Sequence, residues 1–182
     1  MWEQLWAVAI SPYETLGAPR VGVDAVADRW AAEEYSKRAW KRLFVSRRKW
    51  RKIFHGYYVL DLVPPNDGTP AYSNGGPGSY CAAYTFRAKF FNFCEDMLGE
   101  ELSGEAWVHH RPAELTDYGT RLRDHAAAFA EGQGVAAVLG QRLLPESITD
   151  WEDPAVKAHI VDSAARWCLF WGGRGHGMYP DF

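Results

Sequence analysis

The sequence has few cysteines and no pair of them in the arrangement that binds metal or forms a redox couple. Cys81, Cys94 and Cys168 are an odd number and widely spaced, and no CxxC occurs. The sequence also lacks an Asn-x-Ser/Thr glycosylation site. These absences predict reduced thiols in a cytoplasmic protein rather than a secreted fold held by disulfides.

Long hydrophobic runs are missing as well. No segment approaches the roughly eighteen consecutive apolar residues that a membrane-spanning helix needs. Residues 1–10, MWEQLWAVAI, lack the basic start, long apolar middle and small-residue cleavage site of a signal peptide. We therefore expect neither a membrane span nor a secretory leader.

Motifs for catalysis and for metal or phosphate binding are absent too. There is no HExxH or HxxxH, and the adjacent His109 and His110 cannot both point the same way on a helix or strand. The glycines at 75–76 are not followed by the lysine of a P-loop. We expect no catalytic residues, no cofactor and no metal site, which favours a binding protein over an enzyme.

The most informative absence is that of acidic residues between positions 37 and 52, KRAWKRLFVSRRKWRK, here called the basic segment. It contains nine of the twenty Lys and Arg residues of the chain. The remainder has eleven basic and twenty-three acidic residues, a net charge of −12, so the overall charge of −3 conceals a strongly cationic stretch. Its predicted binding residues are Lys37, Arg38, Lys41, Arg42, Arg48, Lys49, Arg51 and Lys52.

Size and composition are those of a globular protein. A chain of 182 residues can bury a core, and 47% hydrophobic and 24% charged residues are ordinary values. Nine Trp, nine Tyr and nine Phe exceed the usual share and suit cores and interfaces. We expect a single domain over 1–182, of a mainly α fold.

Residue periodicity and end signals place the elements of this fold. One long helix is predicted over 25–54, with a break near 45–46, and a short strand over 57–63. Glycine- and proline-rich stretches at 64–79 and 172–182 are predicted to be irregular. Further helices are predicted at 80–98, 113–130, 135–144 and 154–171, the last with Asp153 as its N-cap and Pro154 in its first turn.

The basic segment is predicted to be amphipathic. At 100° per residue its charges lie opposite an apolar sector in which Trp40 and Trp50 anchor the helix to the body. A continuous helix would present Lys37, Lys41, Arg48 and Lys52 as one row about 22 Å long. Residues 44, 45 and 47 are out of phase with this pattern, and a break at Ser46 is the simplest explanation.

Several interpretations of the basic segment remain open. It is a surface for nucleic acid or for an acidic protein or nucleoprotein, a solvated helix face, or an amphipathic helix lying on a membrane. The leading hypothesis is a non-enzymatic binding protein of the inhibitor, immunity or adaptor type. The alternative is an enzyme with a site between the 64–79 loop, Asp61 and the tail at His176.

Overall fold

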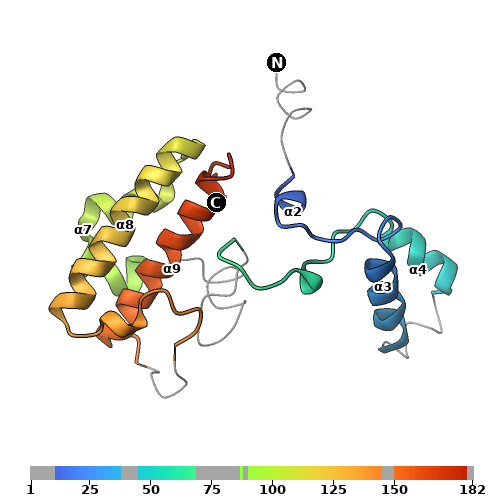
Figure 1. Cartoon of the computed structure of the whole chain (residues 1–182), viewed down its shortest axis with the longest axis horizontal. Coiled ribbons are helices and arrows are strands. Elements are labelled where there is room, and N and C mark those ends of the chain that lie inside the picture. Colours follow the sequence, from blue (N-terminus) through green and yellow to red (C-terminus); the bar gives the residue numbers. More distant parts are fainter. Residues whose placement is uncertain (1–10, 38–44, 69–86, 88–89, 145–149, 180–182) are drawn as a thin grey trace. The chain divides into compact units, whose positions relative to one another are not determined.

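The computed structural model describes residues 11–37, 45–68, 87, 90–144 and 150–179, and it forms two compact units, 1–64 and 65–182 (Figure 1). Helices dominate both units, so the mainly α class is confirmed. Over the ranges just given there is no strand, only two isolated antiparallel bridges. The expectation of one domain over 1–182 stays a prediction.

The first unit is built on two helices that pack against each other, α3 (Ala25–Lys37) and α4 (Arg47–Phe54). A short helix, α2 (Pro12–Thr15), precedes them, and the 3-10 turn η2 (Leu60–Leu62) follows. The two main helices confirm the predicted break in the helix 25–54. The small core of the unit comprises Val21, Ala27, Ala31 and Val59, with Trp30, Phe54 and Leu62 packed against it.

The strand expected at 57–63 is reduced to one bridge between Arg20 and Tyr58, followed by η2. Val21 N–H donates to Tyr57 O at 2.9 Å, and Val59 N–H donates to Pro19 O at 2.8 Å. The only partner in the described part of this unit is the short stretch 19–21, because the chain then turns into α3. A ladder needs a partner of its own length, and a lone two-stranded ribbon is marginal in water.

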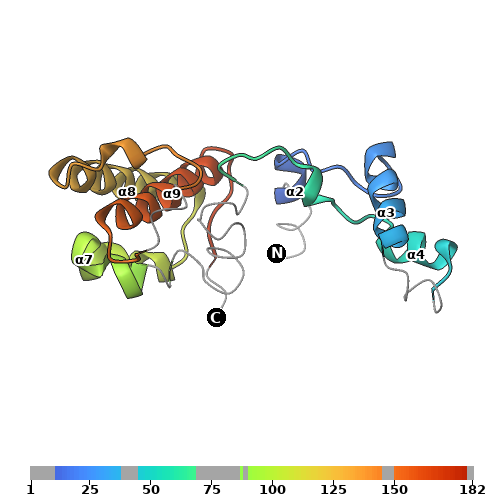
Figure 2. The ribbon, with the colours of Figure 1, turned by 90° about the horizontal axis from the view of Figure 1, so that it is seen from below.

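The second unit is centred on the pair α8 (Pro112–Gly132) and α9 (Pro154–Gly172), which lie side by side in both views (Figures 1 and 2). The helices are antiparallel, because the Cα of Gly172 near the end of α9 faces Pro112 O at the start of α8. Both match their predicted ranges, and the Asp153 carboxylate caps α9 by accepting from Ala155 N–H at 2.7 Å.

Two glycines allow α8 and α9 to approach closely. A Cβ atom added to Gly119 would lie 2.9 Å from Cys168 Cβ and 3.1 Å from Ala165 O. One added to Gly172 would lie 2.4 Å from Thr116 Oγ1. Side chains at either position would therefore force the two helices apart.

The remaining helical predictions need correction. The segment 135–144 contains only the 3-10 turn η5 (Ala136–Val138), because Gly140 adopts a left-handed φ of 74° and its N–H donates to the Asp162 carboxylate instead.

The predicted helix 80–98 is not one regular α-helix. Arg87 is helical, the π-helix η3 (Phe90–Cys94) follows, and α7 (Glu95–Gly104) begins directly after it. Gly99 has the left-handed φ of 71° expected at a helix end, yet helical hydrogen bonding resumes after it. The rest of 80–98 lies outside the described residues.

A partly buried polar network holds the start of the second unit to α9. The Arg166 guanidinium donates to Asp67 at 2.6 Å, to Asp162 at 3.0 Å and to Gln141 O at 2.8 Å. Gly68 packs against the Phe170 ring. Among the helices that the structure describes, none is long and apolar enough to cross a membrane.

Candidate functional site

The site is built on α4, which starts afresh after Ser46. Ser46 has extended backbone angles, φ −68° and ψ 156°, and its hydroxyl accepts from Lys49 N–H at 3.3 Å. α3 ends at Lys37 and α4 begins at Arg47 with Ser46 as its N-cap. Lys37 is therefore not in one continuous helix with Arg48 and Lys52, and Lys41 lies outside the described residues.

Trp50 anchors α4 to α3. Its side chain is 5% exposed, and the indole N–H donates to Ala31 O at 3.0 Å. Its ring packs against those of Tyr35 and Phe54, with centroid distances of 5.8 and 4.6 Å. Tyr35 adds a second tie, because its hydroxyl donates to Val45 O at 2.9 Å. The anchoring role predicted for Trp50 is confirmed, whereas Trp40 lies outside the described residues.

The same packing bears on the membrane interpretation. Most of the apolar side of α4 is used within the first unit, because Trp50 is buried and Phe54 packs against the core. Ile53, which is 60% exposed, is the exception. An amphipathic helix needs a broad free apolar face to lie on a bilayer, and α4 offers one residue.

The cations of α4 are all exposed. The helix has Arg47, Arg48, Lys49, Arg51 and Lys52 within eight residues and no acidic residue. None of these five forms an ion pair with any residue in the described ranges. Three of them occupy the first turn, where the positive end of the helix dipole opposes them. The arrangement therefore concentrates positive charge without compensating it.

Lys37 is in a different position. It ends α3, and its ammonium donates to the Glu34 carboxylate at 2.7 Å. This hydrogen bond and the charge of Glu34 raise the pKa of Lys37. Of the other predicted binding residues, Arg38, Lys41 and Arg42 lie outside the described residues, so the structure brings together only the four on α4.

A shallow hollow lies along the outer side of α4, here called the cationic groove. At 100° per residue, the five positions that line it fall within a sector of 140° around the helix axis. It is lined by Arg47, Arg48, Arg51, Lys52 and His55. His55 follows the helix and is fixed over the turn at Gly22, whose added Cβ would lie 2.7 Å from the imidazole Cδ2. The sequence analysis missed this histidine, although its spacing of four residues from Arg51 could have indicated it.

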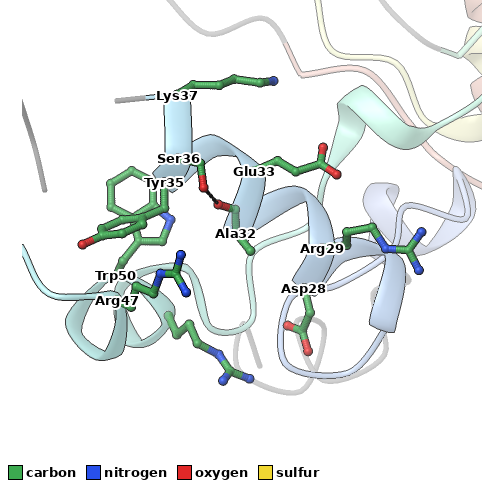
Figure 3. A pocket seen from close by; sticks show the side chains of 10 residues that line it. Asp28, Arg29, Ala32, Glu33, Tyr35, Ser36, Lys37, Arg47 and Trp50 are labelled. Atoms are coloured by element: carbon green, nitrogen blue, oxygen red, sulfur yellow. Dashed lines mark hydrogen bonds between the residues drawn. The ribbon is translucent and has the colours of Figure 1, made fainter. Parts of the chain in front are cut away.

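A second hollow lies between α3 and α4 and shares Arg47 and Arg51 with the cationic groove. Figure 3 shows Tyr35, Trp50 and Arg47 together at one end, with Asp28 farther along α3. On the α3 wall the acids Asp28 and Glu33 are matched by the cations Arg29 and Lys37. The lining of the cationic groove has no acidic residue, so an extended anion is favoured on that side of α4.

The residues expected to form the alternative enzyme site are Asp61, the 64–79 loop and His176. Asp61 is exposed on η2, so it is not the buried carboxylate that an apolar strand would have required. In the second unit, the His176 ring packs edge-on against Trp171 at 4.9 Å. Residues 69–79 of the loop lie outside the described ranges. No group of three or more His, Cys, Asp or Glu among the described residues could hold a metal ion.

Formal charge divides along the boundary between the two units. Residues 1–64 contain eleven basic and seven acidic residues, a net charge of +4. Residues 65–182 contain nine basic and sixteen acidic residues, a net charge of −7. Of the two units, the one that contains α4 therefore has the net positive charge.

Comparison with known proteins adds no assignment: no protein-family model, curated protein or solved structure matches the chain.

Proposed function

We propose that the chain is a small, cytoplasmic, non-enzymatic binding protein that contacts a polyanion through α4. The partner is nucleic acid or the acidic surface of a protein or nucleoprotein, as in proteins of the inhibitor, immunity or adaptor type. The observation that supports this proposal is the exposure of five cations on one eight-residue helix that has no acid of its own.

Two physical arguments support a binding role over a solvated face. Like charges at i and i+4, such as Arg47 with Arg51 and Arg48 with Lys52, cost a few tenths of a kcal/mol each on an isolated helix. The cations in the first turn add a further unfavourable term. A merely solvated helix avoids both costs by interleaving acids, and the second unit does so at Arg121 with Asp117.

The anchoring of α4 also suits binding. Because Trp50 and Tyr35 hold the helix by a tilted ring contact and two hydrogen bonds to the backbone, its cations are presented from a fixed support. Less conformational entropy is then lost when they engage a ligand.

The test is binding to two labelled polyanions at low salt, an oligonucleotide and a polyglutamate peptide, followed by fluorescence anisotropy. We expect the wild-type protein to bind at least one of them and the double variant Arg48→Glu/Lys52→Glu to lose that binding. Arg123→Glu is the matched control, since Arg123 is an exposed cation on α8. Failure of the wild-type protein to bind either polyanion would reject the proposal.

A further inference from the structure

The lining of the cationic groove distinguishes between the two classes of polyanion. All five side chains that form it are cationic or imidazole, and none is apolar. The buried centre of a protein–protein interface is depleted of charge and depends on aromatic or aliphatic anchors that enter pockets. Phosphate backbones, in contrast, are bound by polar and charged groups, arginine and lysine above all, and need no apolar anchor. The groove therefore fits a chain of phosphates better than an acidic protein surface.

An exposed aromatic residue, Tyr57, follows the last residue of this groove, His55, two positions along the chain. Tyr57 is 51% exposed and stacks on Trp30, with ring centroids 6.1 Å apart and planes inclined by 13°. It also contacts Phe54, with the two ring planes nearly perpendicular and their centroids 5.6 Å apart. One face of the Tyr57 ring thus packs on Trp30, while about half of the residue remains exposed to solvent.

The backbone fixes the Tyr57 ring in this position. Tyr57 N–H donates to Phe54 O at 2.9 Å, and Tyr57 O accepts from Val21 N–H at 2.9 Å. Gly56, with a left-handed φ of 84°, makes the turn that leads from His55 to Tyr57. Two residues span at most about 7 Å, so the ring follows the last groove residue directly along the chain.

From this juxtaposition we infer that the first unit binds single-stranded nucleic acid. Phosphates of the strand lie in the cationic groove, and a base stacks on the outer face of Tyr57. This inference rests on the proposed function and names its ligand. A rigid aromatic platform next to a positive groove is the combination by which proteins hold single strands without regard to sequence.

A duplex fits the same surface less well. Bases in a duplex are stacked on one another and present no free face to a tyrosine ring, so Tyr57 would contribute nothing to duplex binding. Neither the groove nor α4 contains an asparagine or glutamine to read base edges. We therefore expect the first unit to prefer single-stranded over paired DNA and to show little preference for base sequence.

The experiment measures the affinity of the full chain for three labelled probes by anisotropy: a mixed-sequence single-stranded DNA, the same sequence as a duplex, and polyglutamate. Tyr57→Leu removes the ring but keeps an apolar contact with Trp30, and Tyr57→Trp keeps a platform. Tyr179→Leu is the matched control, because Tyr179 is a 73% exposed tyrosine of the second unit. Circular dichroism checks that each variant is folded.

We expect single-stranded DNA to bind more tightly than the duplex, and Tyr57→Leu to weaken single-strand binding about 10-fold. Tyr57→Trp and Tyr179→Leu should bind the single strand like wild type, and duplex affinity should be the same in all variants. For the single strand, each cation removed from the groove should lower the slope of log affinity against log salt by about 0.7.

Other outcomes overturn the inference in separable ways. If both DNA probes bind equally and Tyr57→Leu has no effect, α4 binds polyanions as proposed but no base stacks on Tyr57. Binding of polyglutamate but not of DNA would keep the proposed function and transfer it to an acidic protein. Absence of binding to all three probes would reject both the inference and the proposed function.

Discussion

The indole N–H of Trp50 donates a hydrogen bond of 3.0 Å to the backbone carbonyl of Ala31, nineteen residues earlier in the chain. This bond joins the middle of α4 to the middle of α3 in an otherwise small core. Trp50 is the buried residue of this eight-residue helix, so the bond contributes strongly to the position of its cations.

Replacing Trp50 should therefore loosen α4 as a whole. We expect Trp50→Ala to remove about 3–5 kcal/mol from the local stability of α3 and α4, through the lost ring and the lost indole hydrogen bond. Ile53→Ala, on the exposed side of the same helix, should cost less than about 1 kcal/mol. Amide hydrogen exchange in the two helices measures both changes, and equal loss of protection in the two variants would show that Trp50 is not the anchor.

The close contact of α8 with α9 predicts opposite effects for two glycine substitutions. Gly119→Ala should destabilise the protein by about 1–3 kcal/mol, because the new methyl group would lie 2.9 Å from Cys168 Cβ. Gly132→Ala should be neutral or stabilising by up to about 1 kcal/mol, because no atom lies within 4 Å of its Cβ position. Urea denaturation followed by circular dichroism compares them. A similar change in both would mean that helix propensity, rather than packing, governs Gly119.

His159 should make stability depend on pH. Burial lowers the pKa of this fully buried imidazole, whose Nε2 hydrogen bonds to Gln141 O at 3.1 Å. The unfolded chain then binds a proton more readily than the folded one, so its contribution is present above pH 6.5 and is lost as pH falls through the lowered folded-state pKa.

We expect the free energy of unfolding to decline between pH 7.5 and 5 more steeply in wild type than in His159→Gln, by at most about 1.4 kcal/mol per pH unit. The control His125→Gln replaces an exposed histidine on α8 and should keep the wild-type slope. Parallel curves for wild type and His159→Gln would show that this imidazole takes up its proton without opening the fold.

The two described cysteines should be unreactive while the protein is folded. Cys94 and Cys168 are fully buried thiols outside any disulfide, and burial raises the pKa of Cys168 to about 12. At pH 8 about one in ten thousand Cys168 side chains is then a thiolate, the form that reacts.

In a Cys81→Ser variant, a thiol reagent at pH 8 should detect no fast-reacting thiol in the native protein and two in denaturant without prior reduction. Rapid native labelling would indicate that the α8–α9 contact opens frequently. Recovery of fewer than two thiols after unfolding would reveal a disulfide and contradict the expectation of a reduced protein.

The sequence predicted correctly those elements whose ends are determined by neighbouring residues. Asp153, Pro154 and the apolar spacing after them predicted α9 correctly, because a capping residue and a helical period both act within one turn. The break at Ser46 was predicted for the same reason, from residues out of phase with their neighbours.

The incorrect predictions concern segments whose structure depends on distant partners. Gly140 ends the expected helix at 135–144 because its N–H is taken by Asp162, a contact across twenty-two residues that no local pattern indicates. For the site, the sequence predicted the cations but not the groove they share with His55, nor the stacking of Tyr57 on Trp30. Both need the chain to return after α4, and that return is set by the bridge of Arg20 with Tyr58.

The division of charge between the two units has a practical consequence for purification. A net charge of −3 and an isoelectric point near 6.1 suggest a protein that only an anion exchanger retains at neutral pH. With +4 on residues 1–64 and −7 on 65–182, however, each unit offers a resin its own sign of charge. Because salt at 0.1 M screens exposed charges beyond about 10 Å, a resin interacts with the charges that contact it rather than with the net charge of the chain. The protein should be retained by both a phosphocellulose and a quaternary-amine column at low ionic strength, and released from the first by less salt once α4 has lost its arginines.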